Sequence, residues 1–217
     1  MSSKKNILIF GSNSDIARYL IKNISKSSNL FLFSSKGWFD LANLNLDSLF
    51  QKFETKIKNV EYFDEVFYFN WLSDGYYDKL NYQKIIYLFN INLIGYFYLV
   101  NTLYKSNKLK NTFIFSFSSV RSLNPWSSPI YASTKVWLNN IIKYFAKNYY
   151  PYWIFINFIL WPVDTKNISI QKKEILKNNT LTKELLSPKE LVSIIQNFPR
   201  SKYFNGSFIP INILNNV

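Results

Sequence analysis

The stretch 6–33, "NILIFGSNSDIARYLIKNISKSSNLFLF", predicts a strand, a turn, a helix and a second strand. Residues 6–10 form a continuous apolar run that ends at Gly11, which is typical of a buried strand. Apolar residues then recur at helical spacing from Ile16 to Ile24, and Asp15 is placed to cap the start of this helix. With the second apolar run at 29–33, the stretch predicts a βαβ unit.

The same alternation continues to the end of the chain. Further apolar strands are predicted at 65–71, 112–119, 153–160 and 206–212, and helices at 82–105, about 132–148 and 187–198. Alternating helices and continuously apolar strands favour a parallel sheet covered on both faces. We therefore predict an α/β fold: a single Rossmann-type domain over 1–217 with a doubly wound parallel sheet. The polar segment 166–186 is expected to be a mobile excursion from it.

Composition narrows the classes of protein. The chain has 217 residues, of which 48% are hydrophobic and 18% charged, which suits one folded domain. The net charge of +13 is scattered and forms no long run, so we expect no nucleic-acid partner. No secretory signal is visible, and the apolar run 153–162 is too short to cross a membrane. We expect a soluble cytoplasmic protein without a membrane partner.

The absence of histidine directs attention to "YASTK", residues 131–135. Without histidine, acid–base chemistry at neutral pH must use other side chains. Tyr131 and Lys135 are four residues apart, which places them on one face of the predicted helix. A nearby ammonium group favours the phenolate form of a tyrosine. From these residues alone, a chance pairing at the start of an amphipathic helix is the alternative.

Other polar groups follow the ends of the predicted strands. They are Gly11 to Asp15, Ser35 and Lys36, Asn70, Ser118 and Ser119, and Pro162 to Thr165. Ligands of open parallel sheets bind beyond the carboxyl ends of the strands, so we expect these groups to line one site. Either serine could hold a substrate oxygen there.

Six segments in this order resemble the short-chain dehydrogenase/reductase family over nearly the whole chain. They are "LIFGSNSDIA" (8–17), "FNINLIG" (89–95), "FSFSSVRS" (115–122), "YASTK" (131–135), "WPVDT" (161–165) and "YFNGSFIPIN" (203–212). The first resembles the glycine-rich cofactor turn of the family, and "YASTK" has its YxxxK signature. The resemblance implies an enzyme, a nicotinamide-dependent oxidoreductase that interconverts a carbonyl and an alcohol.

The resemblance also implies a role for each site residue. Tyr131 would be the acid or base, Lys135 would lower its pKa and hold the nicotinamide ribose, Ser119 would orient the substrate oxygen, and Asn92 would hold a relay water. Cofactor contacts are implied for Gly11, Ser12, Asn13, Ser14, Asp15, Ile16, Ser35, Lys36, Asp40, Leu41, Asn70, Tyr131, Lys135, Pro162, Val163 and Thr165. We expect no metal.

Some positions depart from the family pattern. The turn keeps Gly11 only, since Asp15 and Ala17 replace its other glycines. The usual distance to the tyrosine selects Ser118 as the catalytic serine, whereas the "SSV" pattern selects Ser119, which we prefer. The eroded turn motivates an alternative function, a catalytically weak nucleotide-binding scaffold or sensor. An extended-type nucleotide-sugar epimerase is disfavoured because little chain remains after Thr165.

The cofactor and partners can also be predicted. An acid at the end of the second strand would bind the ribose of NAD, but this chain has Ser34, Ser35 and Lys36 there and no acid before Asp40. We therefore predict a preference for NADP, with NAD as the alternative. The lysine-rich segment 163–186 favours an anionic or nucleotide-linked substrate. Helices 82–105 and 132–148 carry apolar residues beyond one stripe, including Tyr96, Tyr98 and Trp137, which would extend the surface available to a partner. The resemblance implies a homodimer or homotetramer built on these two helices.

Overall fold

The computed structural model describes residues 4–34, 45–70, 72, 81–123, 128–166, 168–180 and 182–211. In this part of the chain one sheet has the strand order β2-β1-β3-β4-β5-β6, and all neighbouring strands are parallel. The strands are β1 (Lys5–Phe10), β2 (Ser28–Phe33), β3 (Phe63–Tyr68), β4 (Leu109–Ser119), β5 (Trp153–Leu160) and β6 (Ser207–Ile211). The predicted parallel sheet is confirmed.

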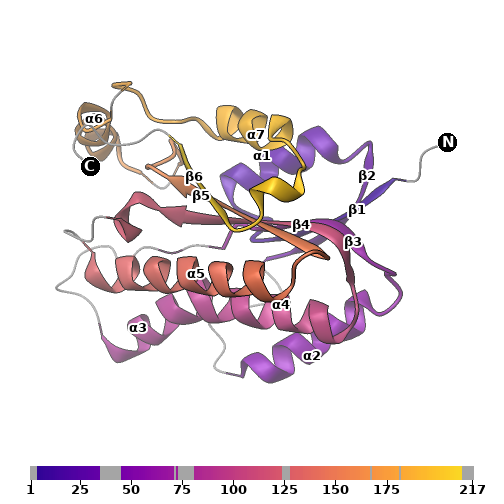
Figure 1. Cartoon of the computed structure of the whole chain (residues 1–217). Helices are drawn as coiled ribbons and strands as arrows, with labels where there is room; N and C mark the ends of the chain where they lie inside the picture. Colours follow the sequence, from indigo (N-terminus) through magenta and orange to yellow (C-terminus); the bar gives the residue numbers. More distant parts are fainter. Residues whose placement is uncertain are drawn as a thin grey trace.

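Helices cover both faces of this sheet, as Figure 1 shows. One layer consists of α1 (Asp15–Ile24) and α7 (Pro188–Asn197), which contact each other. The other contains α2 (Leu46–Ile57), α3 (Tyr82–Phe89), α4 (Gly95–Lys105) and α5 (Pro129–Asn148). The chain moves from β1 to β2 on one side and returns to β3 on the other, so the fold is doubly wound. The strand order reverses at β1, where such folds bind dinucleotides.

Two helices were missed by the sequence analysis. In α2, the buried residues Leu46, Leu49, Phe50, Phe53 and Ile57 have helical spacing, and Asn45 caps the first turn by accepting the Ser48 N–H at 3.0 Å. This signal was present in the sequence. Helix α6 (Ile170–Asn178) lies within the segment predicted as an excursion and has a weak apolar face on which only Leu176 is buried. The segment 166–186 is therefore partly helical.

The predicted helix 82–105 is helical throughout, but its middle turn, Asn90–Ile94, is a π-helix. Such wider turns shift the hydrogen-bond ladder and are frequent at functional sites. The Tyr68 hydroxyl donates to the Ile91 carbonyl of this turn at 2.5 Å. Among the described residues, 82–105 is also the one helical run that is long and apolar enough to cross a membrane. Here its buried side packs in the core, with Leu93 and Leu99 among the contacts.

One expectation about the helix surface was wrong. Tyr96 was predicted to extend the apolar surface available to a partner, but it is fully buried in the core of its own chain. Tyr98 is partly buried, and its hydroxyl donates to Asp47 at 2.9 Å. Trp137 is 58% exposed, as expected. Periodicity alone could not separate these residues, because α4 is apolar around most of its circumference.

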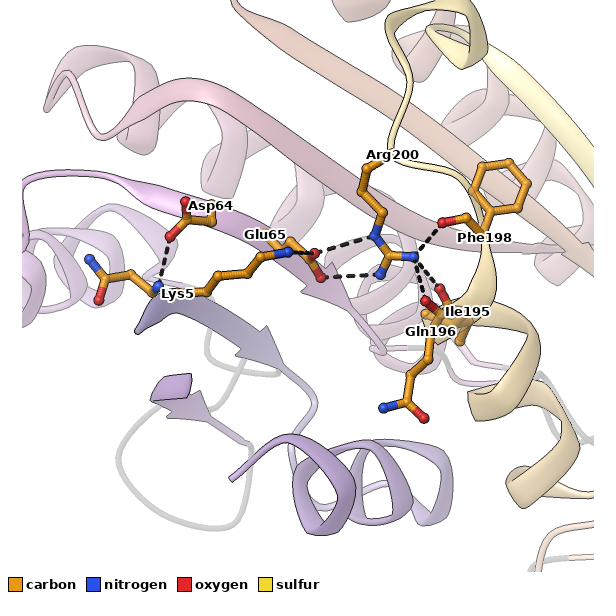
Figure 2. A network of polar contacts seen from close by, with 8 residues as sticks. Lys5, Asp64, Glu65, Ile195, Gln196, Phe198 and Arg200 are labelled. Atoms are coloured by element: carbon orange, nitrogen blue, oxygen red, sulfur yellow. Dashed lines mark hydrogen bonds and ion pairs between the residues drawn. The ribbon is translucent and has the colours of Figure 1, made fainter. Parts of the chain in front are cut away.

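A buried ion network ties β1 and β3 to the end of α7 (Figure 2). Glu65, which is 5% exposed, accepts two hydrogen bonds from the Arg200 guanidinium at 3.3 Å each and one from Lys5 at 3.0 Å. Arg200 also donates to the carbonyl groups of Ile195, Gln196 and Phe198 at the end of α7. A planar guanidinium can serve a carboxylate and a helix C-terminus together, which suits a structural role.

We expect Arg200→Met to lower the unfolding free energy by about 2–3 kcal/mol, because the buried Glu65 carboxylate loses its two-point partner. Lys5 still pairs with Glu65, so the loss stays below that of a fully broken buried pair. Lys5→Met is the matched control. The Lys5 side chain is 56% exposed, and its loss should cost about 1 kcal/mol or less. Chemical denaturation measures both, and equal small losses would contradict this assignment.

Candidate active site

The ends of β1, β2 and β3 meet at Gly11. The N–H groups of Gly11 and Ser12 both donate to the Phe33 carbonyl, at 2.9 and 3.1 Å. Gly11 has φ +77°, and a Cβ added there would lie 2.6 Å from Oδ1 of Asn70. Glycine is therefore required at this turn for both its conformation and its space. Gly11 and Asn70 lie side by side at this edge of the sheet, where the sequence analysis expected one site.

The start of α1 differs from the prediction in one respect. Ser14 is the N-cap, since its Oγ accepts the Ala17 N–H at 3.2 Å. The predicted cap, Asp15, instead accepts the backbone N–H of Lys166 at 3.1 Å. This distant partner could not be read from local sequence. Asn13 donates to Ser34 Oγ at 2.7 Å, while the Ile16 side chain is buried in the core, so only its backbone could reach a ligand.

Tyr131 and Lys135 lie in the first two turns of α5, which begins at Pro129, earlier than predicted. Both side chains are buried, and Lys135 is only 1% exposed. The Lys135 Nζ lies 5.7 Å from the centre of the Tyr131 ring and donates to the Phe117 carbonyl at 3.1 Å. Burial lowers the pKa of Lys135 to about 7. The fold thus brings the predicted pair together. The Lys135 side chain can gain or lose a proton near neutral pH.

Asn92 lies in the π-turn and is fully buried. Its side chain holds Leu72 at two points, because Oδ1 accepts the Leu72 N–H and Nδ2 donates to the Leu72 carbonyl, each at 2.8 Å. Nδ2 also donates to Thr134 Oγ1 at 3.2 Å, and Thr134 in turn donates to the Tyr131 carbonyl at 2.7 Å. Asn92 thus joins the end of β3 to the turn of α5 that carries Tyr131. Its implied role in a water relay remains a prediction.

The two candidate serines have different surroundings at the end of β4. Ser119 Oγ accepts the Arg121 N–H at 3.3 Å and caps the short 3-10 helix Val120–Ser122. Ser118 is 4% exposed, and its hydroxyl lies 3.5 Å from Ser122 Oγ. Both serines therefore make an internal polar contact. The preference for Ser119 over Ser118 stays a prediction.

The segment after β5 brings its predicted residues to the same edge of the sheet. Val163 is buried and forms a parallel bridge with Leu186, and the Asp164 N–H donates to the Leu186 carbonyl at 2.8 Å. Pro162 and Thr165 are partly exposed on either side. Trp161 packs against Val120, Ile159 and Leu176, and its Nε1 has no hydrogen-bond partner within the described ranges.

Some predicted positions cannot be placed. Ser35, Lys36, Asp40 and Leu41 lie outside the described residues. Over the part of the chain that is described, no group of three or more histidine, cysteine, aspartate or glutamate side chains could hold a metal ion.

The fold is shared with solved dehydrogenase structures. A short-chain dehydrogenase family protein from Francisella tularensis has 18% identity and a TM-score of 0.82, over 96% of this chain and 97% of that one. The angucycline C-6 ketoreductase LanV with bound NADP has 14% identity and a TM-score of 0.80, over 95% and 93%. A small-chain dehydrogenase in complex with NADPH has 13% identity and a TM-score of 0.81, over 97% of each chain.

No family model matches the chain, and no curated protein matches it. The structural matches nevertheless cover nearly the whole chain at high TM-scores. The chain therefore has the Rossmann-type fold of short-chain dehydrogenase/reductases. At identities this low, the matches establish the fold and do not assign roles to the site residues.

Proposed function

We propose that the chain is a nicotinamide-dependent oxidoreductase of the short-chain dehydrogenase/reductase type that interconverts a carbonyl and an alcohol. One observation carries the proposal: Lys135 is buried 5.7 Å from the Tyr131 ring at the edge of the sheet where such folds bind dinucleotides. Within the described ranges no ion pair joins Lys135 to a carboxylate. Burying such a lysine destabilises a protein, so its presence favours a functional role.

In this mechanism, Tyr131 donates its phenolic proton to the carbonyl oxygen during reduction and accepts it during oxidation. The Ser119 hydroxyl donates a hydrogen bond to the same oxygen and fixes its position. Protonated Lys135 favours the phenolate form of Tyr131. Asn92 supports Tyr131 through Thr134. The nicotinamide, when bound, supplies or accepts the hydride.

The residues around Gly11 fit a dinucleotide. The missing side chain at Gly11 lets the turn after β1 pack closely against Asn70. The first turn of α1 starts at this point, and the N-terminus of a helix attracts phosphate. Residues 11–16 would hold the pyrophosphate, Tyr131 and Lys135 the nicotinamide ribose, and Pro162, Val163 and Thr165 the nicotinamide. Asp15 adds a negative charge here, which its bond to the Lys166 N–H partly offsets.

The test is turnover by the wild-type chain. We expect NADPH to be consumed in the presence of at least one member of a panel of ketones and aldehydes that includes anionic and nucleotide-linked compounds. NADPH binding without turnover of any panel member would instead favour the scaffold or sensor. The absence of both binding and turnover would reject the dinucleotide site itself.

We further propose that NADP is preferred over NAD, on the strength of Ser35 and Lys36 after β2 and of the bound NADP or NADPH in two of the similar structures. Lys36→Ala is expected to weaken NADPH binding about tenfold to hundredfold, because a charge-assisted contact to the 2′-phosphate contributes roughly 1.5–3 kcal/mol. NADH binding should be unchanged. Fluorescence titration measures both, and equal affinities of the wild type for the two cofactors would refute the preference.

The lysines of the segment 163–186 bear on the class of substrate. Several lysines of 163–186 already have partners: Lys173 with Asp164, Lys177 with Glu174 and Lys183 with the Asn178 carbonyl. Lys166 and Lys172 are exposed on the same segment. We propose an anionic or nucleotide-linked carbonyl compound. A neutral substrate that binds without contact to 163–186 would contradict this.

The proposed assembly is a homodimer or homotetramer in the cytoplasm. Exposed apolar side chains lie on α4 and α5: Phe97, Tyr104, Val136, Trp137 and Tyr144. Sedimentation at micromolar concentration should show an oligomer in the wild type and a shift toward monomer in Trp137→Glu, because a charge would be buried at the interface. Tyr203→Glu, at a position 86% exposed outside these helices, is the control. A monomeric wild type would contradict the proposal.

A further inference from the structure

A chain of polar side chains runs from Ser116 on β4 through β5 and α5 to the end of β4. The Ser116 hydroxyl donates to Asn157 at 3.1 Å, Asn157 donates to Asn139 at 2.9 Å, and Asn139 donates to Ser122 at 3.1 Å. Ser122 then donates to the Ser119 carbonyl at 2.7 Å. Every donor points the same way, toward Ser119.

The end of β4 needs such donors. Its pairing with β3 ends at Tyr68 and Ser116, whereas β4 continues to Ser119. Among the described residues, the pairing with β3 supplies no donor to the carbonyl groups of β4 beyond that point. Lys135 supplies one to the Phe117 carbonyl, and Ser122 supplies the other to the Ser119 carbonyl.

Residues of α5 provide or hold both donors, because Lys135 is one of them and Asn139 donates to the other, Ser122. Tyr131, Lys135 and Asn139 follow at intervals of four residues, so they lie on one face of this helix. Lys135 reaches β4 directly, and Asn139 reaches it through Ser122. The backbone of Ser119 is therefore fixed relative to the helix that carries Tyr131.

We propose that Asn139 is a positioning residue that, through Ser122, sets the placement of Ser119 relative to Tyr131. The proposal rests on the function proposed above, in which Ser119 and Tyr131 contact the same substrate oxygen. Asn157 holds the Asn139 amide in the orientation that presents its N–H to Ser122. Errors of about 1 Å in such placement can lower turnover about a hundredfold.

The test compares kcat in Asn139→Leu, Ser122→Ala and Ser122→Thr. We expect the first two to lose about tenfold to hundredfold in kcat with unchanged NADPH affinity, and Ser122→Thr, which keeps a hydroxyl, to retain most of it. Ser116→Ala is the matched control: it removes the first donor but leaves the bonds from Asn157 to Ser119, so kcat should stay near the wild-type value. A general loss of stability would weaken NADPH binding as well and would not be rescued by threonine.

A second measurement does not depend on turnover. The Arg121 amide donates to Ser119 Oγ, and its hydrogen exchange should become faster in Asn139→Leu and Ser122→Ala but not in Ser116→Ala. If the wild type reduces no carbonyl, the proposed function fails, while this exchange still reports whether Asn139 holds the turn. Unchanged exchange, or faster exchange with wild-type kcat in an active enzyme, would overturn the inference.

Discussion

Replacing Tyr131 by phenylalanine is expected to lower kcat about 10²–10⁴-fold, the usual contribution of a general acid or base. The substitution removes one hydroxyl and keeps the ring. The ring lies next to Lys135 and is largely buried, so the fold and the NADPH affinity should change little. Because the chain has no histidine, no imidazole can replace the phenol.

Rates of NADPH oxidation by Tyr131→Phe and by the wild type, at equal occupancy by NADPH, measure this loss of kcat directly. Tyr19→Phe is the matched control, since Tyr19 is 45% exposed on α1. It should behave as the wild type. If Tyr131→Phe also turned over at the wild-type rate, another group would have to be the proton donor, and the mechanism would be wrong.

Replacing Lys135 by methionine should have two opposite effects. Turnover should be lost about as severely as with Tyr131→Phe, because the cation that activates the phenol is absent. The protein without ligand should become more stable by about 2–4 kcal/mol at pH 7. Burial lowers the Lys135 pKa to about 7, and each pKa unit is worth about 1.4 kcal/mol. The Phe117 carbonyl loses its hydrogen bond from Lys135 in this variant, which removes part of the gain.

The stability gain should depend on pH in a defined direction. Between about pH 7 and the ordinary lysine pKa of about 10.4, the unfolded chain binds the Lys135 proton but the folded chain does not. The unfolding free energy of the wild type therefore rises with pH across this range. The difference in unfolding free energy between Lys135→Met and the wild type should shrink toward pH 10. Denaturation of both proteins at several pH values measures the difference. An advantage that is constant with pH would contradict the assigned cause.

Much of the fold followed from local patterns, because buried parallel strands are continuous apolar runs that stand out between polar turns. The strand at 153–160 was predicted with the bounds that the structure has. Helix α2 was missed although its apolar residues have helical spacing. Helix α6 could not be found in this way, since its sequence has almost no apolar face.

The site was predictable where spacing along one element determines it. Tyr131 and Lys135 are four residues apart on α5, so their proximity followed from the helix. Contacts between distant elements could not be inferred. Asp15 on α1 accepts a hydrogen bond from the Lys166 N–H after β5. Asn139 on α5 forms hydrogen bonds with Asn157 on β5 and with Ser122 after β4. These contacts form only because the sheet brings the elements together. Nothing local in the sequence specifies such pairs.

The structure of the complex with NADPH tests the central claim most directly. The account predicts that the dinucleotide crosses the carboxyl ends of β1 and β3, with its pyrophosphate at Gly11 and the start of α1. Its nicotinamide ribose should lie within hydrogen-bond distance of Lys135 Nζ, and the ring should face the Tyr131 hydroxyl. A dinucleotide bound elsewhere, or with its nicotinamide away from Tyr131 and Lys135, would contradict the account.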